Sequence, residues 1–335
     1  MIQKNLPNGD KDIRRIEEKA TGLKPKNFKE IFKKASKQSW EIWLLMIKIY
    51  IPIAFLTVIL KQIGVIDTIA QFFSPVMSLL GLPGETAITL IAGSLNTVYA
   101  AAATLTTFEL NARELTILAV VVGISHSLIL ETAILKKLKT ANERIALFRF
   151  FMGIFVGILM NLLLPRDIAP TFQLKRPYIS DEKFSWLKTI EGIFSTCIQI
   201  FLILSVIMLI YEIFMFFRLS KIAKKLMAIQ RLSGISYNAF PPWIVGLFIG
   251  LLYGAGLLFQ FEKNKKINKR DGCLLTIFLV LAHAIIEDTM IFAALGANFF
   301  WAVAVRISIA FLFTRILATR DLYKKFLWIG LNEKN

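Results

Sequence analysis

The chain has 335 residues, of which 56% are hydrophobic and 28 are phenylalanine, and its formal net charge is +17. Soluble globular chains contain about 45–50% apolar residues, whereas several stretches here approach the roughly 20 apolar residues that span a bilayer. The basic residues lie in short segments between apolar runs, where the positive-inside rule places them in membrane proteins. We therefore attribute the positive charge to orientation of the chain in the membrane and not to nucleic-acid binding. The two cysteines lie in apolar segments without CxxC spacing, which excludes a disulfide framework or zinc knuckle.

Residues 1–38 are rich in lysine and are predicted to form a basic amphipathic segment on the cytoplasmic surface of the membrane. Phe28, Ile31, Phe32 and Ala35 recur there at helical spacing, with lysines around them. The first apolar run begins only near residue 40, so no cleavable signal peptide is predicted.

Residues 39–165 are predicted to form a first membrane repeat of five helical elements. The predicted elements are 40–62, 66–80, 85–106, 113–137 and 143–164. Gly93 interrupts the third element, and the fourth carries His126 near its middle. The second element is short and has to cross the membrane, or enter it partly, for the topology below.

Residues 166–195 form a polar linker and the start of a helix, residues 196–323 a second membrane repeat, and residues 324–335 a cytoplasmic tail. An ungapped shift of 157 positions (283 minus 126) aligns His283 with His126, and it aligns the sequence LAHAIIEDT at 281–289 with ISHSLILET at 124–132. The same shift aligns Gly250 with Gly93. Matching polar residues inside apolar segments indicate an internal duplication.

Basic loops occupy opposite positions in the two repeats. Residues 136–144, after the first histidine span, are basic, whereas their counterparts at 293–301 carry no charge. Residues 263–270, before the second histidine span, are basic, whereas their counterparts carry little positive charge. Because an inverted repeat reverses this bias, we predict an all-α integral membrane protein with two inverted-topology repeats of about five helical elements each, including broken or re-entrant helices. The expected location is the cell membrane, multi-pass, with the N- and C-termini cytoplasmic.

Both histidines are predicted to lie near the bilayer centre, where ionisable side chains are costly and indicate function. An acid and a threonine follow each one: Glu131 and Thr132, or Asp288 and Thr289. On an ideal helix, positions i and i+5 are about 140° apart. His126 and Glu131 can therefore meet only if the helix is broken, and the alternative is that the acid pairs with another helix.

The second repeat adds Glu287 four positions after His283, on the same helical face, so we expect it to have the sharper role. Histidines that only fix helix packing are the structural alternative. Arg306 is predicted to lie inside the membrane and pair with Glu287 or Asp288, whereas Arg149, near a basic loop, is expected to extend to the interface. The small residues of the interrupted spans fit close helix packing and unwound backbone equally well.

The element order, with the sequences GETA at 84–87, GSLN at 93–96 and SHSLILET at 125–132, resembles the Gate or nucleoside recognition membrane family. Relatives include spore maturation proteins, the membrane part of ferrous iron transport protein B and concentrative nucleoside transporters. The resemblance covers both repeats and implies a transport-like fold, while specificity for nucleosides is not carried over. The GTPase domain that accompanies the ferrous iron transporter is not found in this chain.

Three functions remain as alternatives. The first is secondary, ion- or proton-coupled transport of a small polar solute through a central histidine and carboxylate site, because histidine titrates near neutral pH and no nucleotide-binding motif is visible. The second is transport or binding of a divalent metal ion such as iron, zinc or manganese. The third is a non-transporting scaffold or assembly protein. An enzyme is not expected, because no nucleophile stands out.

The candidate substrate-binding residues are Ser94, Asn96, His126, Glu131, Thr132, Tyr253, His283, Glu287, Asp288 and Thr289. The candidate metal ligands are His126, His283, Glu131, Glu287 and Asp288. A divalent metal or a coupling cation is the cofactor that this site would accept. The expected partners are the lipid bilayer and a small polar solute or ion, and a homo-oligomer stays open.

Overall fold

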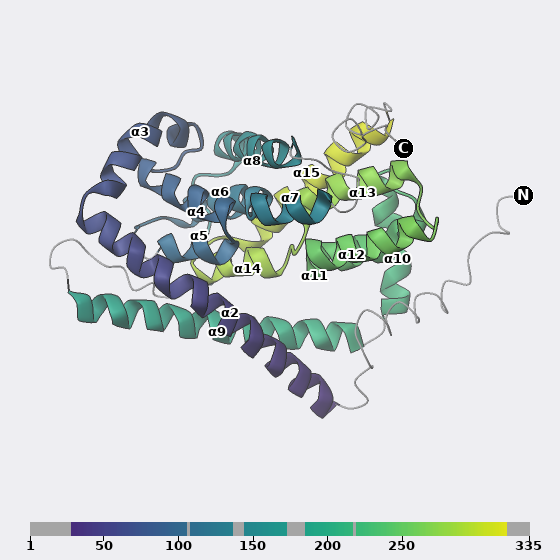
Figure 1. Cartoon of the computed structure of the whole chain (residues 1–335), viewed down its shortest axis with the longest axis horizontal. Helices are drawn as coiled ribbons and strands as arrows, with labels where there is room; N and C mark the ends of the chain where they lie inside the picture. Colours follow the sequence, from purple (N-terminus) through teal and green to yellow (C-terminus); the bar gives the residue numbers. More distant parts are fainter. Residues whose placement is uncertain (1–27, 106–107, 137–143, 173–184, 217–218, 320–335) are drawn as a thin grey trace, which may run out of the picture.

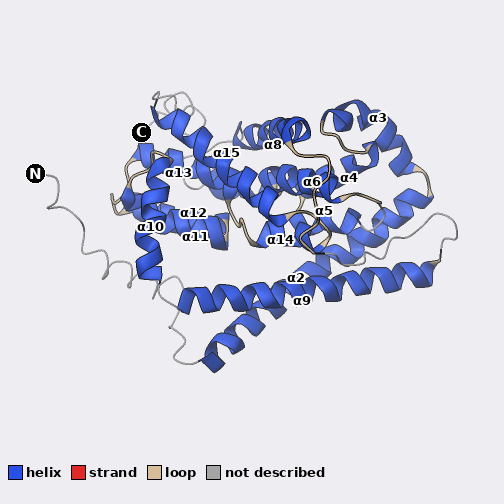
Figure 2. Cartoon of the chain, turned by 180° about the vertical axis from the view of Figure 1, so that it is seen from behind, coloured by secondary structure: helices blue, strands red, loops and turns tan. Residues whose placement is uncertain are grey.

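The computed structural model describes residues 28–105, 108–136, 144–172, 185–216 and 219–319. Within these ranges every regular element is helical, as predicted (Figures 1 and 2). The first half contains α2 (Phe28–Gln62), α3 (Val65–Leu79), the 3-10 turn η1 (Gly84–Thr86), α4 (Ala87–Leu95), α5 (Val98–Thr104), α6 (Ala112–Ser125), α7 (Leu128–Lys136) and α8 (Arg144–Leu163). The second half contains α9 (Trp186–Phe216), α10 (Leu219–Leu232), η4 (Tyr237–Ala239), α11 (Phe240–Ile249), α12 (Leu251–Lys263), α13 (Lys269–Ala282), α14 (Glu287–Ala294) and α15 (Phe299–Thr319).

Six helical segments of the described chain are long and apolar enough to cross a membrane. A seventh candidate is the pair formed by residues 65–79 and 84–95, which bends by 96° and is either a broken span or a re-entrant loop. The short second element predicted from the sequence is the first arm of this pair. These lengths and compositions are those of a multi-pass membrane protein.

Residues 28–38 of the predicted amphipathic segment belong to α2, which continues without a break from Phe28 to Gln62. Ile31 and Ala35 are buried, whereas Phe28 and Phe32 are exposed. Residues 1–27 of the predicted segment lie outside the described residues.

The two halves have the same order of elements. Helices α6 and α13 begin and end at positions that differ by 157, in agreement with the ungapped alignment. The alignment of Gly93 with Gly250 is wrong, however. The Gly93 carbonyl accepts a hydrogen bond from Ser127 N–H, and the equivalent bond in the second half runs from Ala284 to Gly246. Ser127 follows Gly93 by 34 positions, whereas Ala284 follows Gly246 by 38. The second half therefore has four additional residues in this interval, where α12 is longer than α5. An alignment without gaps cannot represent them.

Helices α6 and α13 are the most buried long segments, and they pack against α8 and α15, respectively. Helices α2 and α9 cross along one side of the molecule, as both views show (Figures 1 and 2). Near the start of α6, the Thr116 hydroxyl accepts a hydrogen bond from the N–H of Asn298, which follows α14. The beginning of the first histidine segment therefore lies beside the end of the second.

Candidate functional site

Each histidine lies at a break in its helix. Helix α6 ends at Ser125, His126 is extended, and Ser127 has a φ of 50°. Helix α13 ends at Ala282, His283 is extended, and Ala284 has a φ of 42°. A positive φ costs an L-residue about 1–2 kcal/mol, so the same strained conformation follows both histidines and needs support from its surroundings.

That support comes from a second broken helix in each half. In the first half, Ser127 donates its N–H to Gly93 and its hydroxyl to the carbonyl of Asn96, at the break between α4 and α5. In the second half, Ala284 N–H donates to Gly246, just before the break between α11 and α12 at Gly250. Four helix breaks are thus joined in two pairs by backbone hydrogen bonds, which is how non-helical backbone is tolerated within a membrane protein.

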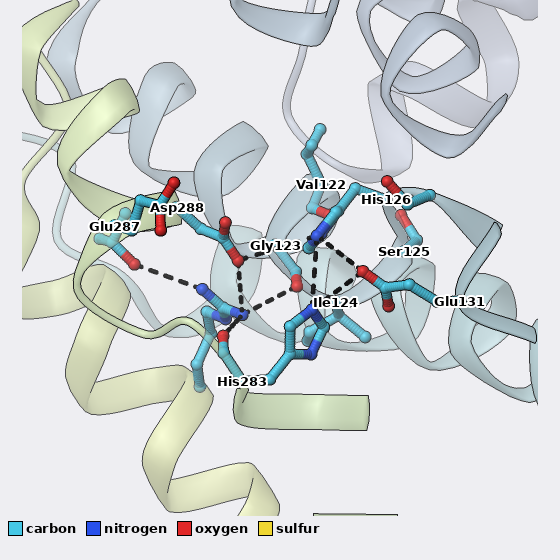
Figure 3. A network of polar contacts seen from close by, with 12 residues as sticks. Val122, Gly123, Ile124, Ser125, His126, Glu131, His283, Glu287 and Asp288 are labelled. Carbon is cyan, nitrogen blue, oxygen red and sulfur yellow. Dashed lines mark hydrogen bonds and ion pairs between the residues drawn. The ribbon is translucent and has the colours of Figure 1, made fainter. Parts of the chain in front are cut away.

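The two breaks bring the histidines together (Figure 3). Their Nε2 atoms are 3.4 Å apart, and His126 and His283 are only 5% and 2% exposed. Nδ1 of His126 lies 3.1 Å from the Val122 carbonyl oxygen, and Nδ1 of His283 lies 2.8 Å from that of Leu279. Because a carbonyl oxygen only accepts, both Nδ1 atoms carry hydrogen and donate. The Nε2 atoms are left to face the centre of the cluster.

Glu131 completes the centre from the first half. Its Oε1 is 3.2 Å from Nε2 of His126 and 3.2 Å from Nε2 of His283. Its Oε2 is 2.6 Å from Nη1 of Arg149. The broken helix brings Glu131 to His126 five positions earlier, which was the first of the two arrangements considered from the sequence. Glu131 also contacts the histidine of the other half.

Asp288 approaches the same centre from the second half. Its Oδ2 lies 3.8 Å from Nε2 of His126 and 3.6 Å from Nη2 of Arg306, and it has no hydrogen-bond partner among the described residues. Ligand atoms from His126, His283 and Asp288 all lie within 4.8 Å of one another. Two histidines and two carboxylates from the two halves therefore meet at one buried point.

Two fully buried arginines occupy the same position in each half. Arg149 donates to the carbonyl oxygens of Ile124 and His126, and Arg306 donates to those of Gly123 and His283. The predicted pairing of Arg306 with Asp288 is confirmed. The expectation that Arg149 reaches the interface is wrong, because its side chain is 0% exposed. The carbonyl oxygens of Ile124 and His126 at the helix break and the Glu131 carboxylate offset the cost of burying the Arg149 charge.

Glu287 does not join His283 in the way that the sequence predicted. The prediction assumed an unbroken helix, but the break places Glu287 at the first position of α14. Its carboxylate accepts a hydrogen bond of 2.8 Å from the hydroxyl of Tyr99 on α5. Tyr99 was missed because its only sequence signal is an aromatic residue before the alanine run at 100–103.

The remaining candidates lie around this centre or away from it. Thr289 accepts a hydrogen bond from Arg306, and Thr132 is buried without a hydrogen-bond partner among the described residues. Ser94 is buried in the last turn of α4. Tyr253 is 62% exposed on α12 and is not brought to the histidines. The carbonyls of Val122 and Leu279 were missed as well, because backbone atoms leave no signal in a sequence.

Residues 43–141 match the family model Gate, described as nucleoside recognition, so the predicted resemblance is confirmed over this segment. An uncharacterized membrane protein of Bacillus subtilis (strain 168), YvoD, is 29% identical over 278 residues, which cover 81% of this chain and 88% of the relative. No solved structure matches the chain. Together with the apolar helices, these similarities establish a multi-pass membrane protein.

Proposed function

We propose that the chain is a secondary transporter that carries a small polar solute or ion through a central site formed by His126, His283, Glu131 and Asp288. The observation that carries the proposal is the origin of these four side chains. Each half contributes one histidine and one acid, at the points where its helices are broken. Transporters with two related halves place their substrate between the halves and build the site from discontinuous helices.

The burial of this cluster supports the same proposal. Ionisable side chains within membrane segments are rare because they are costly, and where they occur they line substrate or ion pathways. Here the cluster lies near the middle of two candidate spans, residues 112–136 and 269–294. Side chains needed only for packing would satisfy one another completely, whereas Asp288 Oδ2 has no hydrogen-bond partner in the part of the chain that the structure describes.

We further propose that the two halves have inverted topology. The basic loops exchange positions between the halves, as described above. The contact of Asn298 with Thr116 supports the inversion, because it places the end of the second histidine segment at the beginning of the first. Two oppositely directed halves around a shared site are the arrangement by which one half can rock against the other and expose the site to alternate sides.

Uptake by proteoliposomes tests the transport function. The purified protein is reconstituted and offered a panel of nucleosides, other small polar solutes and divalent cations under an imposed ion gradient. We expect flux of one class that is lost in the double variant His126→Gln/His283→Gln. The exposed acid variant Glu41→Gln serves as the control, because Glu41 lies at the surface in an ion pair with Lys37. Equal flux in the double variant and the wild type would favour a non-transporting scaffold.

A further inference from the structure

We infer that the cluster is a binding site for a divalent first-row transition-metal ion, held by Nε2 of His126, Nε2 of His283, Oε1 of Glu131 and Oδ2 of Asp288. That this ion is the transported or coupling ion rests on the proposed function. That the cluster binds a metal ion depends only on the geometry of these four atoms.

The first step is the chemical state of the two imidazoles. Both Nδ1 atoms donate to backbone carbonyls, so in the neutral ring each Nε2 has a lone pair and no hydrogen. Metal-binding histidines are oriented in this way, with the other ring nitrogen bonded to a carbonyl or carboxylate. The same arrangement in both halves brings the two Nε2 atoms to 3.4 Å from each other.

The second step concerns the three atoms at the centre when both rings are neutral. Nε2 of His126, Nε2 of His283 and Oε1 of Glu131 are separated by 3.4, 3.2 and 3.2 Å. With neutral rings, all three atoms are acceptors, and three acceptors at these distances repel one another. A positive species between them removes the repulsion. A proton on one Nε2 is shared by one pair of these atoms, whereas a single metal ion satisfies all three lone pairs at once.

The third step is the size of the gap. In a tetrahedral site with bonds of about 2.0–2.1 Å, two ligand atoms lie about 3.3–3.4 Å apart. The three separations at the centre agree with this edge length to within about 0.2 Å, so the atoms already stand at ligand positions for zinc. Asp288 Oδ2 is the fourth ligand: it lies 3.8 Å from His126 Nε2 and has no hydrogen-bond partner among the described residues, and it has to move toward the centre to bind the ion.

The outer contacts explain why the carboxylates present these oxygens. Arg149 binds Oε2 of Glu131, which leaves Oε1 to the imidazoles. At metal sites, side chains that bond to the far oxygen of a carboxylate ligand orient it in this way. The two arginines also balance the two carboxylates, so an ion of charge +2 brings charge that the four groups do not compensate. Binding is therefore weaker than in a structural zinc site, which suits an ion that has to leave again.

The donor set selects the class of ion. Imidazole nitrogens with carboxylate oxygens suit zinc, iron and related ions, whereas calcium and magnesium prefer oxygen ligands alone. No thiolate belongs to the group that the described residues form, so a soft ion such as copper(I) is disfavoured.

The test uses purified full-length protein in detergent, stripped with a chelator and titrated with zinc by calorimetry, with metal content measured after dialysis. We expect one zinc ion per chain. His126→Gln/His283→Gln should lose it. Asp288→Asn should weaken binding by at least about 10-fold, because removing even a group that only contacts a metal ligand costs at least this much. The matched control is the neighbouring acid, since Glu287→Gln should keep the stoichiometry because Glu287 bonds to Tyr99.

A second measurement covers the case in which the double variant does not fold. X-ray absorption of the zinc-loaded wild type should show two imidazole ligands, since the chain has only two histidines. Absence of zinc binding, binding that survives in the folded double variant, or a spectrum without imidazole scattering overturns the inference. Zinc binding without flux would leave the metal site standing and remove the transport function. Histidine-dependent flux of another solute without zinc binding would do the reverse.

Discussion

The imidazoles of His126 and His283 meet at 3.4 Å between their Nε2 atoms, although 157 positions separate the two residues. Neither helix break would achieve this alone. Each break turns one histidine toward the interior, and the packing of the two halves lets both rings arrive at the same point. The meeting of these rings therefore depends on the positive φ angles of Ser127 and Ala284.

Replacing Arg149 with methionine should destabilise the protein by about 3–5 kcal/mol, the cost of leaving a buried charge without its partner. The variant leaves Glu131 Oε2 and the carbonyls of Ile124 and His126 without their donor. Arg149→Lys should not restore stability, because one ammonium cannot reach three acceptors in a planar fan. Denaturation in detergent, followed by tryptophan fluorescence, measures the change. The exposed Arg166→Met is the control, and equal midpoints for the two methionine variants would contradict the assigned role.

A methyl group at Gly123 should displace Arg306. A Cβ at this position would lie 2.9 Å from the guanidinium carbon of Arg306, too close for either atom to remain in place. We expect Gly123→Ala to lower stability by about 1–3 kcal/mol, as overpacking of a core does. Gly256→Ala is the matched control, because nothing lies within 4 Å of its added methyl group. That helical position should gain up to about 1 kcal/mol. The same denaturation experiment compares them, and a stable Gly123→Ala protein would show that Arg306 has room to move.

The positions of the helices could be predicted from the sequence because long apolar runs with polar ends leave few alternatives. The predicted element at 113–137 corresponds to α6 and α7, and the shift of 157 residues places α13 correctly. The prediction that the two histidines share one central site followed from the duplication. What the sequence did not show is the break itself, because no glycine or proline marks it: Ser127 and Ala284 adopt positive φ only through hydrogen bonds to another helix.

The same reason explains the other differences at the site. Arg149 was expected at the interface because its neighbours in the chain are basic, but its partners are carbonyls that only the broken α6 exposes. Glu287 was expected beside His283 on the basis of helical periodicity, which does not continue through the break. Tyr253 lies in a span with small residues, yet that part of α12 is turned outward. Contacts that depend on backbone geometry were not accessible from residue types.

The strained backbone after His283 gives a prediction of opposite sign for two neighbouring alanines. Ala284→Gly should leave stability unchanged or raise it by up to about 1 kcal/mol, since glycine adopts a φ of 42° without steric cost. Ala282→Gly, at the last residue of α13, should lower stability by up to about 1 kcal/mol. Ala284→Val should be worse than either, because a β-branched residue does not tolerate positive φ. Thermal denaturation of the three variants checks the order, and a destabilising Ala284→Gly would contradict it.

Inverted topology has a direct test at one pair of equivalent positions. Glu109, before α6, and Lys266, before α13, differ by 157 positions, and both are exposed. If the halves are inverted, Glu109→Cys and Lys266→Cys lie on opposite sides of the membrane, whereas a parallel duplication puts them on the same side.

The background protein for the labelling experiment has the buried Cys197 and Cys273 replaced by alanine. Labelling of intact cells with a membrane-impermeant maleimide should modify Glu109→Cys only, and Lys266→Cys should react after lysis. Because positive charge favours the cytoplasmic side, Lys139→Cys in the other basic loop should behave like Lys266→Cys. Reaction of Glu109→Cys and Lys266→Cys from the same side would exclude the inversion, and with it the rocking motion proposed for the two halves.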